Sequence, residues 1–187
     1  MLLYIHGFGS CGQGNKVVQL KKYFGANDVL SPDLSHDPPQ AMAQLEELIA
    51  AHPVDMLLGS SLGGYYAEWL NGRHGIPSVL INPSTQPQIT LARLIGPNKE
   101  WCTGKTFNWT AKQVESLGQF QRERPGASER YLLIVQTGDE VLDYRLAAER
   151  YRDYEVVITQ GGNHRFESLE PYLPRIALFR EQFSRSH

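Results

Sequence analysis

Three side chains that together can carry out nucleophilic catalysis, Ser61, Asp139 and His164, occur in that order along the chain. A serine hydroxyl is a weak nucleophile until a neighbouring general base removes its proton, and histidine is the usual base. A carboxylate beside the histidine fixes the imidazole tautomer and stabilises the imidazolium cation. The three residues therefore predict acyl transfer through a covalent intermediate, provided that the fold brings them together.

Ser61 lies in a Gly-x-Ser-x-Gly motif formed with Gly59 and Gly63. Apolar residues 56–58 precede the motif and a helical pattern follows it, which predicts a strand, a sharp turn and a helix. This arrangement is typical of a nucleophile elbow, in which side chains two positions from the serine would collide. The alternative is a glycine-rich strand-to-helix turn with a solvent-facing serine, and the motif alone does not separate the two.

The other two candidates each follow an apolar segment. Asp139 comes directly after residues 131–136, and His164 ends a Gly-Gly-Asn-His loop after residues 155–159. As alternatives, Asp139 is an ordinary turn acid that caps the next helix, or His164 is a loop histidine with a structural hydrogen bond. Asp143 is the rival carboxylate, but we assign it to the start of the following helix.

Acyl transfer also needs two N–H groups that stabilise the oxyanion. We expect them from the backbone of Leu62, which follows the nucleophile, and of Phe8, in a glycine-bearing loop after the first apolar segment. His6 begins that loop, and we expect it to hold the loop in place rather than to transfer protons. Ser60 does not fit the glycine spacing and is expected to pack beneath the turn.

Six apolar segments alternate with helical patterns along the chain. They span residues 1–5, 28–31, 55–59, 77–82, 131–136 and 155–159. Such alternation predicts a mostly parallel sheet with helices on both faces, a three-layer α/β/α fold. Right-handed crossovers then place every strand-to-helix loop at one edge of the sheet. The loops that carry the candidate residues are expected to meet there.

Residues 85–129 interrupt the alternation and are expected to form a small lid-like insertion. The segment is rich in large aromatic residues: Trp101, Phe107, Trp109 and Phe120. We expect Trp101 and Trp109 to bind substrate by lining an acyl pocket beside Ser61. The alternative is that the aromatic residues only anchor the insertion to the core.

Length and composition limit the remaining possibilities. The chain has 187 residues with 41% hydrophobic and 20% charged residues, which predicts a single globular domain over residues 1–187. A net charge of −2 gives no electrostatic case for binding nucleic acid or an anionic membrane. The N-terminal residues do not read as a signal peptide, and the two cysteines, Cys11 and Cys102, are expected to be free thiols in a reducing compartment.

Five separated blocks support a family resemblance. They are Tyr4-Ile5-His6-Gly7-Phe8, Gly59-Ser60-Ser61-Leu62-Gly63-Gly64-Tyr65-Tyr66, Ile81-Asn82-Pro83-Ser84, Gln136-Thr137-Gly138-Asp139-Glu140-Val141-Leu142-Asp143 and Gly161-Gly162-Asn163-His164-Arg165-Phe166. With these blocks the chain resembles the α/β-hydrolase superfamily over nearly its whole length and, more closely, the small bacterial YqiA-like esterases.

The resemblance implies a cytoplasmic serine esterase or thioesterase that hydrolyses small acyl esters or thioesters without cofactor or metal. Compared with the larger superfamily, the chain has no residues for the two strands that usually open the fold. We therefore expect a reduced α/β-hydrolase sheet of six parallel strands in the order 2-1-3-4-5-6. A thin cover over the site favours short to medium acyl chains.

Two other functions are compatible with the same residues. One is an amidase or peptidase that uses the same triad, and the other is a hydrolase-fold protein that binds ligands or partners without catalysis. The sequence leaves the oligomeric state open.

Overall fold

A computed structural model describes residues 1–184 and shows a six-stranded parallel sheet. Its strands are β1 (Leu2–Ile5), β2 (Val29–Leu30), β3 (Met56–Ser60), β4 (Ser78–Ile81), β7 (Tyr131–Gln136) and β8 (Glu155–Thr159). The spatial order is β2-β1-β3-β4-β7-β8, with every neighbouring pair parallel. The predicted order is confirmed, and the last three residues of the expected domain lie outside the described part.

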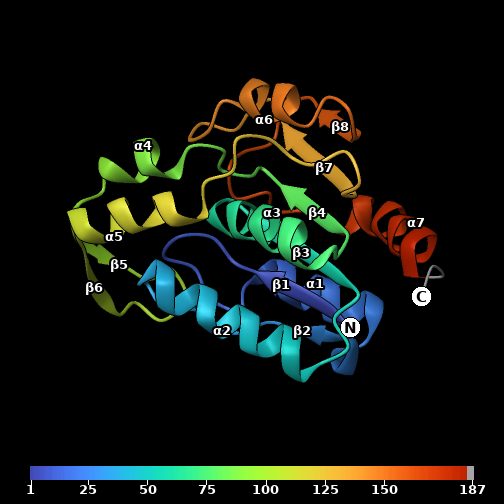
Figure 1. Ribbon diagram of the computed structural model, residues 1–187, viewed down its shortest axis with the longest axis horizontal. Coiled ribbons are helices and arrows are strands. Elements are labelled where there is room, and N and C mark those ends of the chain that lie inside the picture. Colours follow the sequence, from blue (N-terminus) through green and yellow to red (C-terminus); the bar gives the residue numbers. More distant parts are fainter. Residues whose placement is uncertain (185–187) are drawn as a thin grey trace.

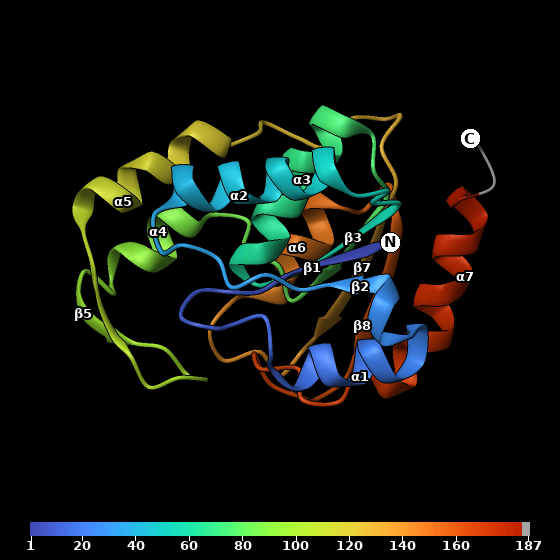
Figure 2. The same ribbon diagram turned by 90° about the horizontal axis from the view of Figure 1, so that it is seen from below.

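Helices cover both faces of the sheet (Figure 2). One face packs against α1 (Asn15–Phe24) and α7 (Leu173–Ser184), and the other packs against α2 (Pro38–Ala51), α3 (Leu62–His74) and α6 (Tyr144–Arg150). Successive strand residues belong to opposite cores: Leu3 and Ile5 face α2 and α3, whereas Leu2 and Tyr4 face α1 and α7. Because side chains alternate across a strand, a sheet covered on both faces needs strands that are apolar throughout.

Local signals explain where the longer helices begin and end. Asp37 accepts a hydrogen bond from the N–H of Gln40 and so caps α2, and Pro38 occupies its first position. α3 ends at Gly75, whose φ of 69° and ψ of 15° lie in the left-handed region that favours glycine. The start of α2 and the end of α3 therefore lie where the sequence provides the chemistry for them.

Residues 85–129 form an extension at the end of the sheet toward which the strand arrows point (Figure 1). It contains α4 (Pro87–Ala92), an antiparallel hairpin of β5 (Gly96–Lys99) and β6 (Thr106–Trp109), α5 (Ala111–Ser116) and a 3₁₀ turn at Leu117–Phe120. The hairpin was not predicted, because Gly-Pro-Asn-Lys in β5 has none of the β-branched or aromatic residues that mark a strand.

The tip of this hairpin folds back onto the loop after β1. The N–H of Trp101 donates a hydrogen bond of 2.8 Å to the carbonyl of Gly9. Next to this contact, Cys11 and Cys102 form a disulfide across 91 residues of sequence, with their Cα atoms 6.2 Å apart. The expectation of two free thiols is therefore wrong, because only the docking of the hairpin brings these two cysteines together.

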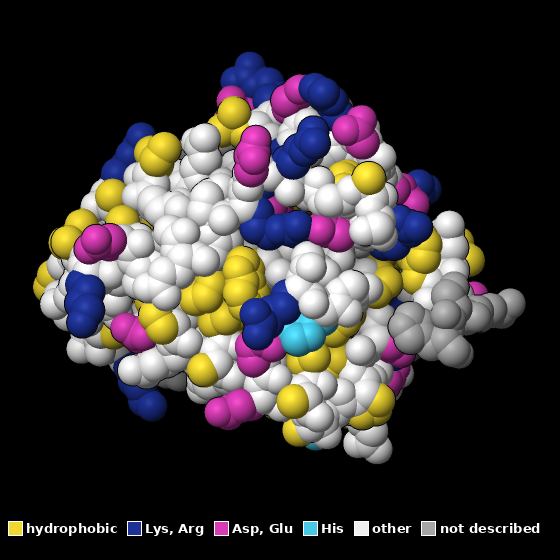
Figure 3. Space-filling view, in the orientation of Figure 1, with side chains coloured by type: hydrophobic (Ala, Val, Ile, Leu, Met, Phe, Trp, Pro, Cys, Tyr) yellow, Lys and Arg dark blue, Asp and Glu magenta, His cyan; other side chains and the backbone are white. Residues whose placement is uncertain are grey.

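Lys and Arg side chains are interspersed with Asp and Glu side chains over the face shown in Figure 3, in keeping with the net charge of −2. Among residues 1–184, none of the helices has both the length and the apolar character needed to cross a membrane.

Candidate active site

Ser61 occupies a strained turn between β3 and α3. Its φ of 56° and ψ of −119° are rare for a residue with a side chain, and such strain is found mainly at functional sites. The flanking glycines are required by space: a Cβ on Gly59 would lie 2.3 Å from the carbonyl oxygen of Gly63, and one on Gly63 would lie 2.0 Å from that of Ile5. The strand–turn–helix geometry is that of the predicted nucleophile elbow.

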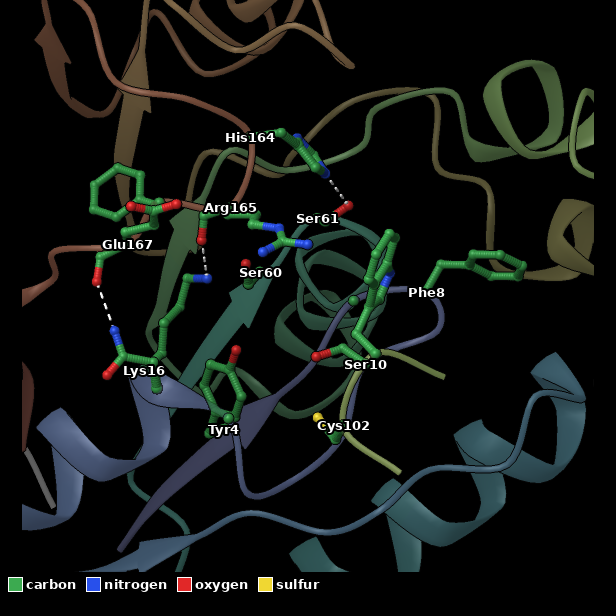
Figure 4. Close-up of a pocket in the computed structure, with 15 residues that line it drawn as sticks. Tyr4, Phe8, Ser10, Lys16, Ser60, Ser61, Cys102, His164, Arg165 and Glu167 are labelled. Atoms are coloured by element: carbon green, nitrogen blue, oxygen red, sulfur yellow. Dashed lines mark hydrogen bonds between the residues drawn. The ribbon is translucent and has the colours of Figure 1, made fainter. Parts of the chain in front are cut away.

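The structure brings Ser61, His164 and Asp139 into one hydrogen-bonded row. The Oγ of Ser61 lies 3.0 Å from Nε2 of His164, and Nδ1 of His164 lies 2.8 Å and 3.0 Å from the two carboxylate oxygens of Asp139. Figure 4 shows the His164 ring pointing toward the hydroxyl of Ser61. In this row the imidazole can take a proton from the serine while the carboxylate holds its other nitrogen.

The Asp139 carboxylate is almost completely buried, with 1% of its side chain exposed. One of its oxygens also accepts the N–H groups of Val141 and Leu142, at 2.9 Å and 2.8 Å. A buried carboxylate needs such donors, and here they also fix its orientation toward His164. Asp143 instead accepts the N–H of Arg145, forms an ion pair with its guanidinium and caps α6.

The loop that carries His164 is held by three side chains that the sequence analysis did not assign. Asn82 donates to the carbonyl of Asn163 at 3.1 Å and accepts the N–H of Gln136 at 3.0 Å. The side chain of Gln136 accepts the N–H of Asn163 at 3.1 Å. The Glu140 carboxylate accepts the N–H of His164 at 2.9 Å, and this hydrogen bond lowers the pKa of Glu140.

Asn82 had one signal in the sequence, because it ends the predicted strand 77–82 at the edge where the candidate loops meet. The other two contacts depend on how the loops after β7 and β8 lie against each other. The contacts of these three residues hold the loop that carries His164.

The backbone expected to stabilise an oxyanion lies beside the nucleophile. A Cβ added to Gly7 would lie 3.0 Å from the Cβ of Ser61, so the loop after β1 passes directly against the serine. Phe8 is the next residue, and its ring packs edge-on against Trp109 at 4.9 Å between centroids. Leu62 is the first residue of α3, and N–H groups in the first turn of a helix have no partner within that helix.

His6 is a buried structural residue of the same loop. Its Nε2 accepts the N–H of Leu34 at 3.0 Å, which leaves Nδ1 to donate to the carbonyl of Gly7 at 2.9 Å. Burial lowers the pKa of His6. Ser60 is also buried, with 5% of its surface exposed, beneath the turn. His6 takes the structural place that the sequence predicted for it, whereas Ser60 also contributes to the lining of the cavity beside Ser61.

A cavity of about 510 Å³ opens at Ser61 (Figure 4). Its lining includes Tyr4, Phe8, Ser61, Trp101, His164 and Arg165. Trp101 is 75% exposed at the rim. Trp109 is 1% exposed, donates its indole N–H to the carbonyl of Leu91 at 3.1 Å and does not line the cavity. Of the two tryptophans expected to bind substrate, the structure therefore places only Trp101 at the cavity.

A family model described as "Uncharacterised protein family (UPF0227)" matches residues 1–181. The chain belongs to the UPF0227 family. A UPF0227 protein from Serratia proteamaculans is 30% identical over 190 residues, which cover 96% of this chain and 98% of that protein. A UPF0227 protein from Yersinia pseudotuberculosis is 29% identical with the same coverage. The predicted YqiA-like resemblance is confirmed at the level of the family.

Solved structures similar to this UPF0227 protein are α/β-hydrolases. Mouse alpha/beta hydrolase domain-containing protein 10 has a TM-score of 0.74 at 12% identity, over 97% of this chain and 89% of that one. Est1E from Butyrivibrio proteoclasticus, solved with bound ferulic acid, has a TM-score of 0.74 at 14% identity over 99% and 89%. A monoacylglycerol lipase from Paleococcus ferrophilus has a TM-score of 0.69 at 15% identity over 99% and 94%. At these identities the similarity establishes the α/β-hydrolase fold.

Proposed function

We propose that this protein is a serine hydrolase that cleaves carboxylic esters or thioesters of short to medium acyl chains. Ser61 is the nucleophile, His164 the general base and acid, and Asp139 the residue that orients His164. The observation that carries the proposal is the row of hydrogen bonds from the Ser61 hydroxyl through His164 to the buried Asp139, at the opening of a cavity.

The reaction follows from this arrangement. The Oγ of Ser61 attacks the acyl carbon as its proton passes to Nε2 of His164. The N–H groups of Leu62 and Phe8 stabilise the oxyanion that forms. When the carbonyl reforms, the alcohol or thiol leaves with the proton from His164, and an acyl ester remains on Ser61. A water molecule, deprotonated by His164, then repeats the sequence and releases the carboxylic acid.

The cavity and the fold support small ester substrates. A volume of about 510 Å³ lies within the usual range for small-molecule sites. The structural neighbours include a monoacylglycerol lipase, whose name denotes ester hydrolysis, and Est1E, which binds ferulic acid, so the fold is compatible with this proposal. In this proposal the segment 85–129 is a minimal lid, and Trp101 at its hairpin tip borders the acyl chain.

The disulfide bears on the prediction of where the protein is located in the cell. Disulfides persist mainly in oxidising compartments, so the bond between Cys11 and Cys102 removes the free-thiol argument for the cytoplasm. The cytoplasmic location stays a prediction that the family resemblance implies.

The direct test is the reactivity of Ser61. We expect a fluorophosphonate probe to label the wild type and Ser60→Ala but not Ser61→Ala. With a p-nitrophenyl ester, Ser61→Ala should lose at least about 10³-fold in kcat, since only oxyanion stabilisation and binding remain. If Ser61→Ala keeps more than about a tenth of the wild-type kcat, the assignment is wrong.

A substrate panel then separates the alternatives. Hydrolysis of acyl esters or acyl-CoA thioesters, with little hydrolysis of acyl anilides, supports the proposal. Preferential cleavage of anilides indicates an amidase. Absence of both labelling and hydrolysis indicates a hydrolase-fold binding protein.

A further inference from the structure

Arg165 is an exposed cation on the lining of the cavity that contains Ser61. It directly follows His164, and its guanidinium carbon lies 4.9 Å from the ring centroid of Trp101. Within residues 1–184, none of the ion pairs of the structure involves Arg165. Other arginines of this protein do pair with carboxylates, among them Arg122, Arg150 and Arg180. The Arg165 guanidinium, which has no carboxylate partner within the described residues, is therefore available to a ligand in the cavity.

The backbone of Arg165 is held in place by α1. Lys16 donates a hydrogen bond from its ammonium group to the carbonyl of Arg165 (Figure 4). Asn15 and Gln19 donate to the carbonyl of Glu167 at 2.8 Å and 3.0 Å. The first turns of α1 thus fix the segment after His164, so that less conformational freedom of this arginine is lost when a ligand binds.

The charge in the cavity favours an anion. Its formally charged lining side chains are Lys16, Arg165 and Glu167, which leaves one positive charge in excess. Burial lowers the pKa of Lys16 to about 8, and the nearby charge of Glu167 acts in the opposite direction. Glu167 therefore balances Lys16, and Arg165 carries the excess charge.

We propose that Arg165 is a specificity-determining residue that binds a carboxylate or phosphate group of the substrate, so that the preferred esters or thioesters are anionic. A guanidinium presents two parallel N–H donors to either anion, which an ammonium group cannot do. The face of Trp101 orients the guanidinium while leaving its N–H edge open. This inference rests on the proposed hydrolase function and extends it to a class of substrate.

The anionic group can belong to either part of the substrate. It is a terminal carboxylate if it lies on the acyl chain, and a phosphate if it lies on the leaving group of a thioester. Two matched pairs distinguish these sources. The first pair is p-nitrophenyl succinate and its methyl ester, and the second is butyryl-CoA and the N-acetylcysteamine thioester of butyrate.

The kinetic test compares wild type, Arg165→Gln and Arg165→Lys on both pairs. One pair carries its charge on the part of the substrate that Arg165 binds. In that pair, Arg165→Gln should lower kcat/KM for the charged member by about tenfold or more, mainly through a higher KM. The uncharged member should change by less than about twofold, and Arg165→Lys should recover part of the loss. Arg124→Gln is the matched control, because Arg124 is exposed and does not line the cavity.

Two kinetic outcomes overturn the inference. One is an equal loss on charged and uncharged members, which means that Arg165 acts only on the position of His164. The other is a wild type that prefers the uncharged member of both pairs.

A binding measurement separates this inference from the hydrolase proposal. In a Ser61→Ala background, calorimetry gives the Kd of butyryl-CoA and of monomethyl succinate, with dimethyl succinate as the uncharged reference. A Kd at least about tenfold weaker for one charged ligand after Arg165→Gln supports the anion site, whether or not the wild type hydrolyses esters. Unchanged Kd values for both charged ligands overturn it. If the wild type shows neither fluorophosphonate labelling nor turnover, that result contradicts the hydrolase proposal but not the anion site.

Discussion

The carboxylate of Asp139 lies 2.8 Å from Nδ1 of His164, although 25 residues separate them in the chain. The contact joins the loop after β7 to the loop after β8, which are neighbouring parallel strands. Because both loops leave the same edge of the sheet, the strand pairing itself places the carboxylate beside the imidazole. The row then ends at the hydroxyl of Ser61 on the elbow after β3.

Asp139→Asn should lower kcat by about 10⁴-fold with a short p-nitrophenyl ester, because an amide in this place favours the wrong imidazole tautomer. Asp143→Asn is the control, since Asp143 caps α6 and pairs with Arg145. Asparagine is also a favoured helix cap, so this variant should change stability little and leave kcat nearly unchanged. A larger loss of kcat in Asp143→Asn than in Asp139→Asn would refute the assignment.

The two tryptophans of the insertion should respond differently to substitution. Trp109→Ala removes a buried ring that packs against Phe8, and should lower the free energy of unfolding by about 3–5 kcal/mol. Trp101→Ala removes an exposed ring and should change the free energy of unfolding by no more than about 0.5 kcal/mol.

Enzyme activity should also distinguish Trp101 from Trp109. If Trp101 borders the acyl chain, each methylene that contacts it adds up to about 0.8 kcal/mol of binding. Trp101→Ala should therefore flatten the rise of kcat/KM from acetyl to hexanoyl esters. Chemical denaturation and a chain-length series measure both effects, and an unchanged chain-length profile in Trp101→Ala would leave that residue without a role in binding.

The disulfide should stabilise the hairpin against the loop after β1. Replacing Cys11 and Cys102 by serine should lower the free energy of unfolding by about 2–4 kcal/mol. A dithiol reductant should lower the Tm of the wild type toward that of the double variant and leave the variant unchanged. An identical Tm for wild type and variant without reductant would show that the bond does not form or does not stabilise.

Stability should fall as the pH drops below about 6.5, the ordinary pKa of histidine, because of His6. Burial lowers the pKa of His6 in the folded protein, so between the two pKa values the unfolded chain binds more protons. Protonation of Nε2 also removes the acceptor for the N–H of Leu34. The contribution of His6 is thus complete above the unfolded pKa and is lost as the pH falls through the folded pKa.

The measurement is the Tm of wild type and His6→Gln between pH 5 and pH 8. Glutamine can accept the same hydrogen bond but does not titrate, so the Tm of the variant should depend less on pH in this range. Equal pH dependence of the two proteins would assign the effect to other groups.

Local residue spacing and strand order were enough to predict the parallel sheet and the edge of the sheet at which the candidate residues meet. The Gly-x-Ser-x-Gly motif specifies the elbow, because Gly59 and Gly63 occupy places where a Cβ would overlap with backbone. Apolar strands that alternate with helices specify the parallel sheet. The handedness of the crossovers then places the loops that carry Ser61, Asp139 and His164 at one edge. These conclusions need only short-range sterics and general rules of sheet topology.

Only the tertiary structure decided how residues 85–129 dock. The strand β5 has no residues that favour a strand, and it forms through pairing with β6. That pairing brings Cys102 to Cys11, exposes Trp101 at the cavity and buries Trp109. Such contacts join segments about 90 residues apart, so they depend on packing across the whole fold and leave no periodic signal in the sequence. The same holds for Gln136 and Glu140, which hold the His164 loop through hydrogen bonds between neighbouring loops.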